Sequence, residues 1–367
     1  MTKTAETVLE IDLNALQHNF EYIKSKLKAN TKTLAVVKAY GYGSDACVIA
    51  KHLEKLNVDY FAVAYVDEGV ALREAGVKTP ILVLHPQIVH FNLLIEHCLE
   101  PNLYSERVLK AFIDLTESEN QKEYPIHLKF NTGLNRLGFK IEDVDTIDDY
   151  LKKTKSIKIA SIFSHLVASE DLNEREFSEN QINSFNKIID KFKSKLNYQP
   201  IYHMANTSGI LNYPNAHFDM VRIGISLYGF GNDQKYTEQL RNVASLKSII
   251  SQIYTINKGE SVGYNRGFTA DKKIITATIP IGHADGIHRS FGKGKGYVTI
   301  NGSKAPIVGN VCMDMVMVDV TDINCKEGDE VIVFNNQQTI IDLASAIDTI
   351  PYEIITAISQ RIKRIVK

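Results

Sequence analysis

Short apolar runs alternate with longer segments of helical period from about Asp12 to Gly231. A strand-like run followed by a helix is the repeating unit of parallel sheets. Eight strand–helix units in roughly 220 residues predict a TIM (β/α)8 barrel. The eight runs are Leu34 to Lys38, Tyr60 to Tyr65, Ile81 to His85, Pro101 to Tyr104, Ile126 to Phe130, Ile159 to His165, Ile201 to Ala205 and Phe218 to Ile223.

A helix is also expected before the first of these runs. Apolar residues recur there at spacings of three or four, which places them on one helical face. Asp12, just ahead of them, is a candidate N-cap. The apolar residues are Leu13, Leu16, Phe20, Ile23 and Leu27.

The pattern changes after Gly231, where the helical period mostly disappears. β-branched runs are separated there by the turn pairs Lys258-Gly259, Asn301-Gly302 and Gly328-Asp329. The sequence therefore predicts a barrel over residues 12–232, followed by a mainly β domain over residues 233–367. Two short helices are expected near its end, at Thr339 to Ile350 and Tyr352 to Ser359. No long Pro, Ser or Gly linker intervenes, so we expect the two parts to pack together.

Composition narrows the class of protein. The chain has 367 residues, a formal net charge of −1 and 44% hydrophobic residues. These values fit two packed domains and show no excess of basic residues for nucleic acid. The first residues lack an apolar signal core, and no stretch approaches the roughly 18 apolar residues of a membrane span. We therefore expect a cytoplasmic protein that binds neither nucleic acid nor membrane.

The cysteines argue against a metal site. They are widely scattered and form no Cys-x-x-Cys pair, and no histidine stands near them at zinc-like spacing. Reduced thiols are therefore expected at Cys47, Cys98, Cys312 and Cys325.

Reactive side chains gather at the ends of the predicted strands. Barrel enzymes place their chemistry at the carboxyl ends of the strands and in the loops that follow. Each residue also has a structural interpretation: His165 as a satisfied core histidine, Arg136 as a surface arginine. Their shared position at one rim favours a common site. They are Lys38, Lys129, His165 and Arg222 at run ends, and Arg136, Asn206 and Thr207 just beyond.

Lys38 is the strongest candidate for chemistry. The apolar run that starts at Leu34 delivers its amine into a turn punctuated by Gly41 and Gly43. A lysine whose pKa is lowered by burial can act as a Schiff-base nucleophile. The alternative is a lysine that snorkels from a strand end to solvent.

A second rim segment is typical of a phosphate site. The run from His203 to Gly209 offers side-chain oxygens before a short helix, and Gly224-Ile225 follows the eighth strand. Barrels often bind phosphate after strands seven and eight, at exposed N–H groups. Taken alone, such a cluster would more often be an ordinary helix cap. A phosphate cradle facing a strand-end lysine implies pyridoxal phosphate.

Several motifs, taken together, resemble those of the alanine racemase family. In chain order they are VVKAYGYG, KFNTGLNRLGF, SHLVASED, HMANTSG, VRIGISLYG, GESVGYN, IPIGHADG, GNVCMDM and PYE. The resemblance covers nearly the whole chain. It implies a barrel joined to a C-terminal β domain that takes in residues 1–11, with a strand at Thr7 to Ile11. It also implies a pyridoxal-phosphate enzyme that interconverts L- and D-alanine, supplies a peptidoglycan precursor and forms a homodimer with shared active sites.

The resemblance assigns roles to individual residues. Lys38 would hold the cofactor as a Schiff base and act as one base at Cα, and Tyr264 of the other subunit would be the second. Arg222 would face the pyridine nitrogen and, with His165, support Tyr264; a fixed cation there disfavours ring protonation and so restrains transamination. The further cofactor contacts would be Tyr42, Arg136, Asn206, Thr207, Gly224, Ile225 and Tyr352.

The remaining assignments concern substrate and modification. The resemblance implies that Arg136 anchors the substrate carboxylate or the cofactor phenolate oxygen, and that the backbone at Met313 helps from the partner chain. Without it, Tyr264 and Met313 would be ordinary residues of a β domain. Lys129 matches a position that is carbamylated in some members.

The sequence departs from the family pattern at three positions. His283 stands where tyrosine is usual near the site entrance, and would add a group that titrates near neutral pH. Asn131 stands where an acid is common, and Thr207 where serine is more frequent.

Other functions on the same scaffold stay open at this point. They are a racemase of serine or lysine, a related decarboxylase, and a non-catalytic pyridoxal-phosphate carrier. Such carriers lack the second domain, whereas about 130 residues follow the predicted barrel here.

Overall fold

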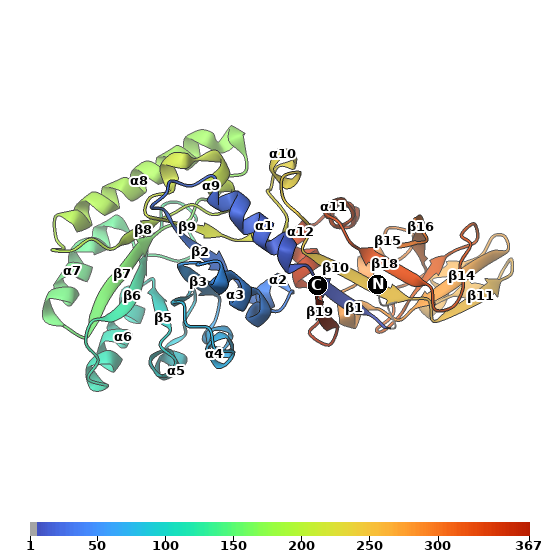
Figure 1. Ribbon diagram of the computed structural model, residues 1–367, viewed down its shortest axis with the longest axis horizontal. Coiled ribbons are helices and arrows are strands. Elements are labelled where there is room, and N and C mark those ends of the chain that lie inside the picture. The colour runs from blue at the N-terminus through green and yellow to red at the C-terminus, as the bar shows by residue number, and fades with distance from the viewer. Residues whose placement is uncertain (1–5) are drawn as a thin grey trace.

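The computed structural model describes residues 6–367, which form two domains side by side (Figure 1). The first domain is a closed barrel of eight parallel strands, as the sequence predicts. Its strands are β2 (Lys32–Val36), β3 (Tyr60–Val63), β4 (Ile81–Val83), β5 (Glu100–Leu103), β6 (Tyr124–Lys129), β7 (Ile157–Phe163), β8 (Ile201–His203) and β9 (Met220–Ile223).

Helices surround the barrel and connect its strands (Figure 1). The α-helices are α1 (Leu13–Lys24), α2 (Lys38–Tyr42), α3 (Ala46–Lys55), α4 (Val66–Glu74), α5 (Phe91–Glu96), α6 (Glu106–Ser118), α7 (Val144–Lys153), α8 (Arg175–Lys193) and α9 (Thr207–Asn212). The 3-10 turns are η1 (Ile88–His90), η2 (Ile141–Asp143), η3 (Leu172–Glu174), η4 (Pro214–Ala216) and η5 (Ile225–Tyr228). In the described part of the chain, no helix combines the length and the apolarity needed to cross a membrane.

Helix α1 packs against η5, the turn that follows the last barrel strand. Asp12 caps this helix as predicted, because its Oδ1 accepts a bond from the N–H of Ala15 at 2.9 Å. The fully buried Asn19 donates to the carbonyls of Leu227 and Arg241, at 3.0 and 2.8 Å. These bonds tie α1 to the segment that leaves the barrel.

The predicted strand runs are in the right order but several of their ends are wrong. β2 ends at Val36, so Lys38 lies two residues beyond the strand that it was expected to end. β7 ends at Phe163, so His165 likewise lies in the following loop. Lys129 does end its strand. The apolar pattern continues into the loops because they cover the barrel rim and are themselves buried.

The second domain is built on a nine-stranded sheet, ordered β11-β14-β17-β16-β15-β18-β10-β1-β19. Its strands are β1 (Val8–Ile11), β10 (Ala244–Ile249), β11 (Gln252–Ile256), β14 (Ile274–Ile279), β15 (Tyr297–Ile300), β16 (Ser303–Val308), β17 (Val316–Asp319), β18 (Glu330–Phe334) and β19 (Lys363–Val366). A small pair, β12 (Ser261–Val262) and β13 (Phe268–Thr269), lies apart. The first strand of the chain thus belongs to the second domain (Figure 1), where it pairs antiparallel with β10 and parallel with β19.

Short helices complete this domain. The predicted turn Asn301-Gly302 joins β15 and β16, and both residues have positive φ, as a tight hairpin requires. The two predicted terminal helices exist but are shorter, as α11 (Gln337–Ala346) and α12 (Pro351–Thr356). The others are α10 (Gln234–Thr237), η6 (Tyr264–Arg266), η7 (His283–Asp285) and η8 (Arg289–Phe291).

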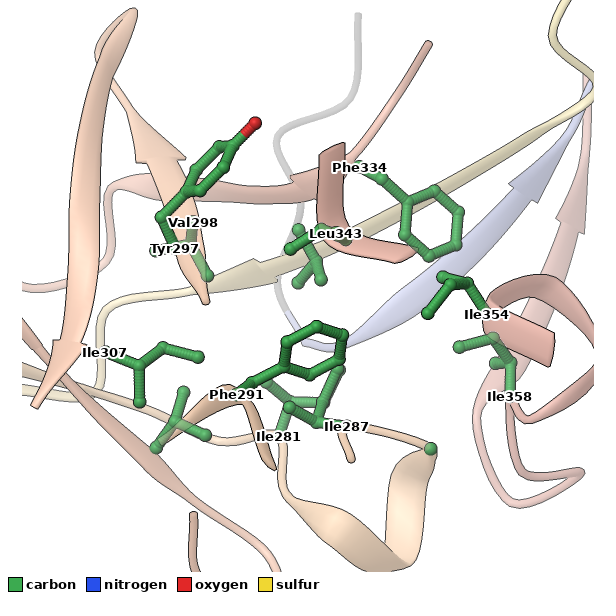
Figure 2. A pocket seen from close by; sticks show the side chains of 13 residues that line it. Ile281, Ile287, Phe291, Tyr297, Val298, Ile307, Phe334, Leu343, Ile354 and Ile358 are labelled. Atoms are coloured by element: carbon green, nitrogen blue, oxygen red, sulfur yellow. The ribbon is translucent and has the colours of Figure 1, made fainter. Parts of the chain in front are cut away.

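Apolar side chains from the sheet and from α11 and α12 form the core of the second domain. Figure 2 shows them around a cavity of about 20 Å³. The cavity has room for about one water molecule, but its lining is almost wholly apolar, which makes it a small packing defect and not a ligand site. Phe291, Phe334 and Ile354 are among its walls.

The barrel contacts the second domain through the turn that carries Lys38. The carbonyl of Gly43 accepts two bonds from the guanidinium of Arg364 in β19, at 3.2 and 2.8 Å. Gly43 has φ +83°, and a Cβ on it would lie 2.2 Å from the carbonyl oxygen of Ile355 in α12. Only glycine allows this approach.

Replacing Gly43 with alanine should therefore destabilise the protein much more than replacing Gly294. Both glycines have φ near +80°, at 83° and 81°, but nothing lies within 4 Å of a Cβ on Gly294. The matched pair thus separates the clash from the backbone cost. We expect Gly43→Ala to lower the free energy of unfolding by roughly 1–3 kcal/mol more than Gly294→Ala. Urea and thermal unfolding measure this difference, and equal midpoints would contradict the contact.

Candidate active site

A cavity of about 560 Å³ opens at the carboxyl ends of the barrel strands. Every barrel residue that the sequence assigns to the site lines it, and so does Tyr352 from the second domain. Tyr264 and Met313 do not line it. The predicted residues present are Lys38, Tyr42, Lys129, Arg136, His165, Asn206, Thr207, Arg222, Gly224, Ile225 and Tyr352.

Lys38 opens a left-handed turn. Ala39, Tyr40, Gly41 and Tyr42 have φ of 53°, 55°, 63° and 51°. Left-handed backbone costs a residue other than glycine roughly 1–2 kcal/mol. Strain of this kind persists where the surrounding structure fixes it, and it is concentrated at functional sites.

Glu68 helps to fix this turn. Its Oε1 accepts a bond from the N–H of Ala39 at 2.6 Å, and its Oε2 accepts one from Ala64 at 2.6 Å. Burial, then the charge of Arg136, lower the pKa of Lys38, whereas Glu68 raises it in part. The amine thus gains a larger neutral fraction, which a nucleophile or base needs.

Arg222 is the most enclosed cation of the site, at 4% exposure. Its Nη1 donates to Nδ1 of His203 at 2.9 Å. Its Nη2 lies within bonding distance of the carbonyls of Ser164 and Met204 and of Nδ1 of His165, at 2.8, 2.8 and 2.9 Å. Burial lowers the pKa of Arg222 to about 9, which still leaves it charged at neutral pH. These four bonds use Nη1 and Nη2 of the guanidinium.

His165 is held neutral. Burial, then the charge of Arg222, bring its pKa well below the usual value. Because Arg222 can only donate, Nδ1 of His165 must accept, and the remaining ring proton sits on Nε2. His165 is hydrogen-bonded, as the core interpretation predicts, but it also lines the pocket, as the site interpretation predicts.

Lys129 and Arg136 also line the pocket. Burial, then the charges of Arg136 and Arg222, lower the pKa of Lys129 to about 8. Arg136 is largely exposed but also lines the pocket. Asn131 shapes its loop, because its Oδ1 accepts from the N–H groups of Gly133 and Asn135 at 3.1 and 2.9 Å. The asparagine thus supplies turn geometry and no charge.

Hydroxyl groups gather around Gly224 in the pocket wall. The Thr207 hydroxyl accepts from the N–H of Gly224 at 3.3 Å and lies 3.1 Å from Ser226 Oγ. Burial raises the pKa of Tyr42 and of Tyr352, so both phenols keep their protons and can donate. Tyr42 also stacks on Tyr228, with ring centroids 4.5 Å apart.

Asn206 caps the short helix α9. Its Oδ1 accepts from the N–H of Gly209 at 2.9 Å and from the hydroxyl of Ser169 at 2.8 Å. From the sequence, Asn206 could be an ordinary helix cap or part of a cofactor site. In the structure it makes the cap bond and also lines the pocket.

Tyr264 and Met313 lie together on the surface of the second domain. They are 75% and 59% exposed. Asn310 joins their loops, since its Nδ2 donates to the carbonyl of Tyr264 at 3.0 Å. The exposed His283 is next to Met313, whose carbonyl accepts from Ala284 at 3.0 Å. In the described residues, no acceptor engages the Met313 N–H.

Some residues of the pocket were not singled out from the sequence. Tyr65 and His85 end the second and third predicted runs, so the rule that sites lie at strand ends would have found them. Leu137 and Asn232 lie in loops that give no such signal. Asn232 donates to the Ser208 and Tyr352 hydroxyls at 2.9 and 3.3 Å. Among residues 6–367, no group of three His, Cys, Asp or Glu side chains is arranged to hold a metal.

Comparison with known proteins agrees with this arrangement. The N-terminal domain model of alanine racemase matches residues 11–231, and the C-terminal domain model matches residues 243–366. Alanine racemase 1 of Caldanaerobacter subterraneus subsp. tengcongensis is 33% identical, over 98% of this chain and 94% of its own.

Solved structures give the same result. Alanine racemase of Clostridium difficile 630 superposes with a TM-score of 0.93 at 33% identity, over 99% of this chain and 96% of its own. Alanine racemase from Bartonella henselae, with covalently bound pyridoxal phosphate, has a TM-score of 0.88 at 30% identity, over 99% and 100%. This chain therefore belongs to the alanine racemase family.

Proposed function

We propose that the protein is a pyridoxal-phosphate-dependent racemase that interconverts L- and D-alanine. One observation carries the proposal: Lys38, at the start of a strained left-handed turn, shares one pocket with a hydroxyl cradle and three further cationic side chains. The similar proteins are named alanine racemases, and the structure from Bartonella henselae contains covalently bound pyridoxal phosphate. No observation favours the serine, lysine, decarboxylase or carrier alternatives.

The pocket suits an anionic cofactor. Lys38, Lys129, Arg136 and Arg222 line it, and no Asp or Glu among the described residues does. Its volume is in the range of small-molecule sites. A Cβ on Gly224 would lie 3.1 Å from the Tyr42 hydroxyl and 3.9 Å from that of Thr207. The glycine therefore leaves open the space between two donors where a phosphate would sit.

The residues divide the work of racemisation. Bound pyridoxal phosphate supplies an electron sink that acidifies the Cα–H of an attached amino acid. Lys38 would hold the cofactor until the amino acid displaces it; its freed neutral amine would then take a proton from one face of Cα, and its ammonium form would return one. Arg136 holds the substrate carboxylate. A group on the opposite face must complete the exchange, because inversion needs both faces.

Tyr264 of a second copy is the group that we assign to the opposite face. His165 presents its Nε2–H, and Arg222 fixes that ring through Nδ1. A donor so held would stabilise a tyrosine oxygen that has lost its proton. Tyr264 and Met313 project from the second domain, where they are exposed and do not line the pocket of their own chain. A homodimer with shared sites gives both groups a function.

Mixing two inactive variants should restore activity if the sites are shared. A Lys38→Ala homodimer and a Tyr264→Phe homodimer each lack one base in every site. After subunit exchange, each heterodimer holds one intact site and one site that lacks both bases. With random pairing, activity should return to roughly a quarter of the wild-type value. A mixture that stays inactive, although exchange is shown by mass spectrometry, would contradict shared sites; Tyr254→Phe mixed with wild type controls for exchange losses.

Lys129 is proposed to carry a carbamate. Carbon dioxide adds to a neutral amine, which then releases a proton. With a pKa of about 8, Lys129 is neutral in about a tenth of molecules at pH 7 and about nine-tenths at pH 9. We expect ¹³C-bicarbonate to give a carbamate signal that rises over this range and is missing in Lys129→Gln. A spectrum without this signal at pH 9 would count against the modification.

The basic test of the function needs only purified protein. L-alanine, D-alanine, L-serine and L-lysine are incubated separately, and the products are separated on a chiral column. We expect alanine to racemise fastest and no carbon dioxide to be released. A faster reaction with serine or lysine would reassign the substrate.

We also place the protein in the cytoplasm, supported by its four unpaired cysteines. We further propose that its D-alanine serves as a peptidoglycan precursor.

A further inference from the structure

A chain of polar side chains crosses the barrel interior from Arg222 to Glu100. Arg222 bonds to Nδ1 of His203, and Nε2 of that ring lies 2.9 Å from Ser161 Oγ. Ser161 Oγ lies 2.6 Å from Nδ1 of His127, whose Nε2 lies 2.7 Å from Glu100 Oε2. The five residues come from the five consecutive strands β9 to β5 (Figure 1). Of these five, only Arg222 lines the pocket.

A network of polar side chains is unusual inside a barrel. Barrel interiors are filled mainly by Val, Ile and Leu. Here His127, Ser161 and His203 are fully buried, and Glu100 is 9% exposed. Buried polar groups are costly unless every one is paired. Because this network costs free energy that an apolar core would not, we look for a function that it serves.

A local irregularity makes the chain possible. In the ladder between β6 and β7, Ile126 pairs with Ile159, but His127 pairs with Ser161. The register shift passes over Ala160. Bulges of this kind redirect side chains and are frequent next to active sites. The bulge brings the imidazole level with the serine hydroxyl.

The hydrogen bonds can all run in one direction. Arg222 only donates, so the neutral His203 accepts on Nδ1 and donates from Nε2 to Ser161. The serine hydroxyl then donates to Nδ1 of His127, and the Nε2–H of His127 donates to the acceptor oxygen of Glu100. Both imidazole rings and the serine hydroxyl of this network therefore have hydrogen-bond partners. Tyr60 also bonds to Glu100, and burial followed by that carboxylate raises the pKa of Tyr60.

We propose that Glu100 and His127 are positioning residues for Arg222, acting through Ser161 and His203. The polar network holds Nη1 of Arg222, while Nη2 bonds to His165 and the side chain lines the pocket. This inference rests on the proposed function, in which Arg222 faces the cofactor ring and His165 supports the second base. It explains why a polar network lies deep inside the barrel, out of reach of any substrate.

Ser161→Ala tests the chain at its midpoint without changing its charge. In the purified holoenzyme we expect kcat for alanine to fall by about tenfold and KM to change by less than about twofold. We also expect the low-field imidazole N–H proton signals of His127 and His203 to shift, and the visible band of the bound cofactor to move. Ser178→Ala is the control, because Ser178 is another fully buried serine and its hydroxyl has no partner among the described residues.

A pair of variants at the far end gives an independent test. Glu100→Gln keeps an oxygen that can accept from His127, whereas Glu100→Leu removes it. We expect Glu100→Gln to retain most of kcat and Glu100→Leu to lose as much as Ser161→Ala. If both disruptive variants match Ser178→Ala in kcat and keep the wild-type N–H signals, the positioning role is wrong. If wild type does not racemise alanine, the proposed function fails, while the N–H signals still decide whether the chain exists.

Discussion

Lys38→Ala should lose racemase activity by more than about 10³-fold, because the variant removes both the cofactor attachment and one of the two bases. The purified variant should also lose the visible absorbance that borohydride fixes to the wild-type protein. Chiral chromatography of L-alanine reactions, together with the spectrum, measures both effects. The loss should be the same in both directions, since a catalyst cannot move the equilibrium.

A matched control separates chemistry from general damage. Lys51 is an exposed lysine on α3, a short distance along the chain from Lys38. Lys51→Ala should keep wild-type activity and absorbance. More than about a tenth of wild-type activity in Lys38→Ala would show that this lysine is neither the attachment point nor a base.

Tyr264→Phe should cause the second largest loss, about 10²–10⁴-fold, because it removes the proposed proton donor and acceptor on one face of Cα. The effect should be unequal between the enantiomers. Exchange of the Cα hydrogen with deuterated water should survive for the enantiomer whose proton Lys38 removes, and should nearly stop for the other. Proton NMR follows both exchange reactions.

Tyr254 provides the control for this substitution. It is a 52% exposed tyrosine on β11 of the same domain. Tyr254→Phe should exchange and racemise like the wild type. Equal loss of exchange for both enantiomers in Tyr264→Phe would contradict the assignment of one base to each face.

Sequence periodicity was sufficient to predict the architecture. The eight runs indicate strand number and order, because parallel strands buried on both faces are mostly apolar. Their ends were less predictable. Lys38 and His165 follow their strands by two residues, since the rim loops are as buried as the strands and continue the same pattern.

Side-chain geometry was beyond the reach of the sequence in two respects. Glu68 fixes the lysine turn from 29 positions away, and no local spacing marks such a contact. The polar network from Arg222 to Glu100 depends on the bulge at Ala160, which periodicity does not reveal. Most of the pocket residues were found because they lie at or just beyond the ends of predicted strands, whereas Tyr42 and Tyr352 were found only through the family motifs. The partner roles of Tyr264 and Met313 stay predictions.

The placement of β1 in the second domain has a consequence for synthesis of the chain. Val8–Ile11 leaves the ribosome early, but its first partner, Ala244–Ile249, follows more than 230 residues later. The barrel can close during this interval, while β1 stays unpaired. An unpaired strand edge can pair with another nascent chain. Translation speed and chaperone supply should therefore affect the yield of folded protein.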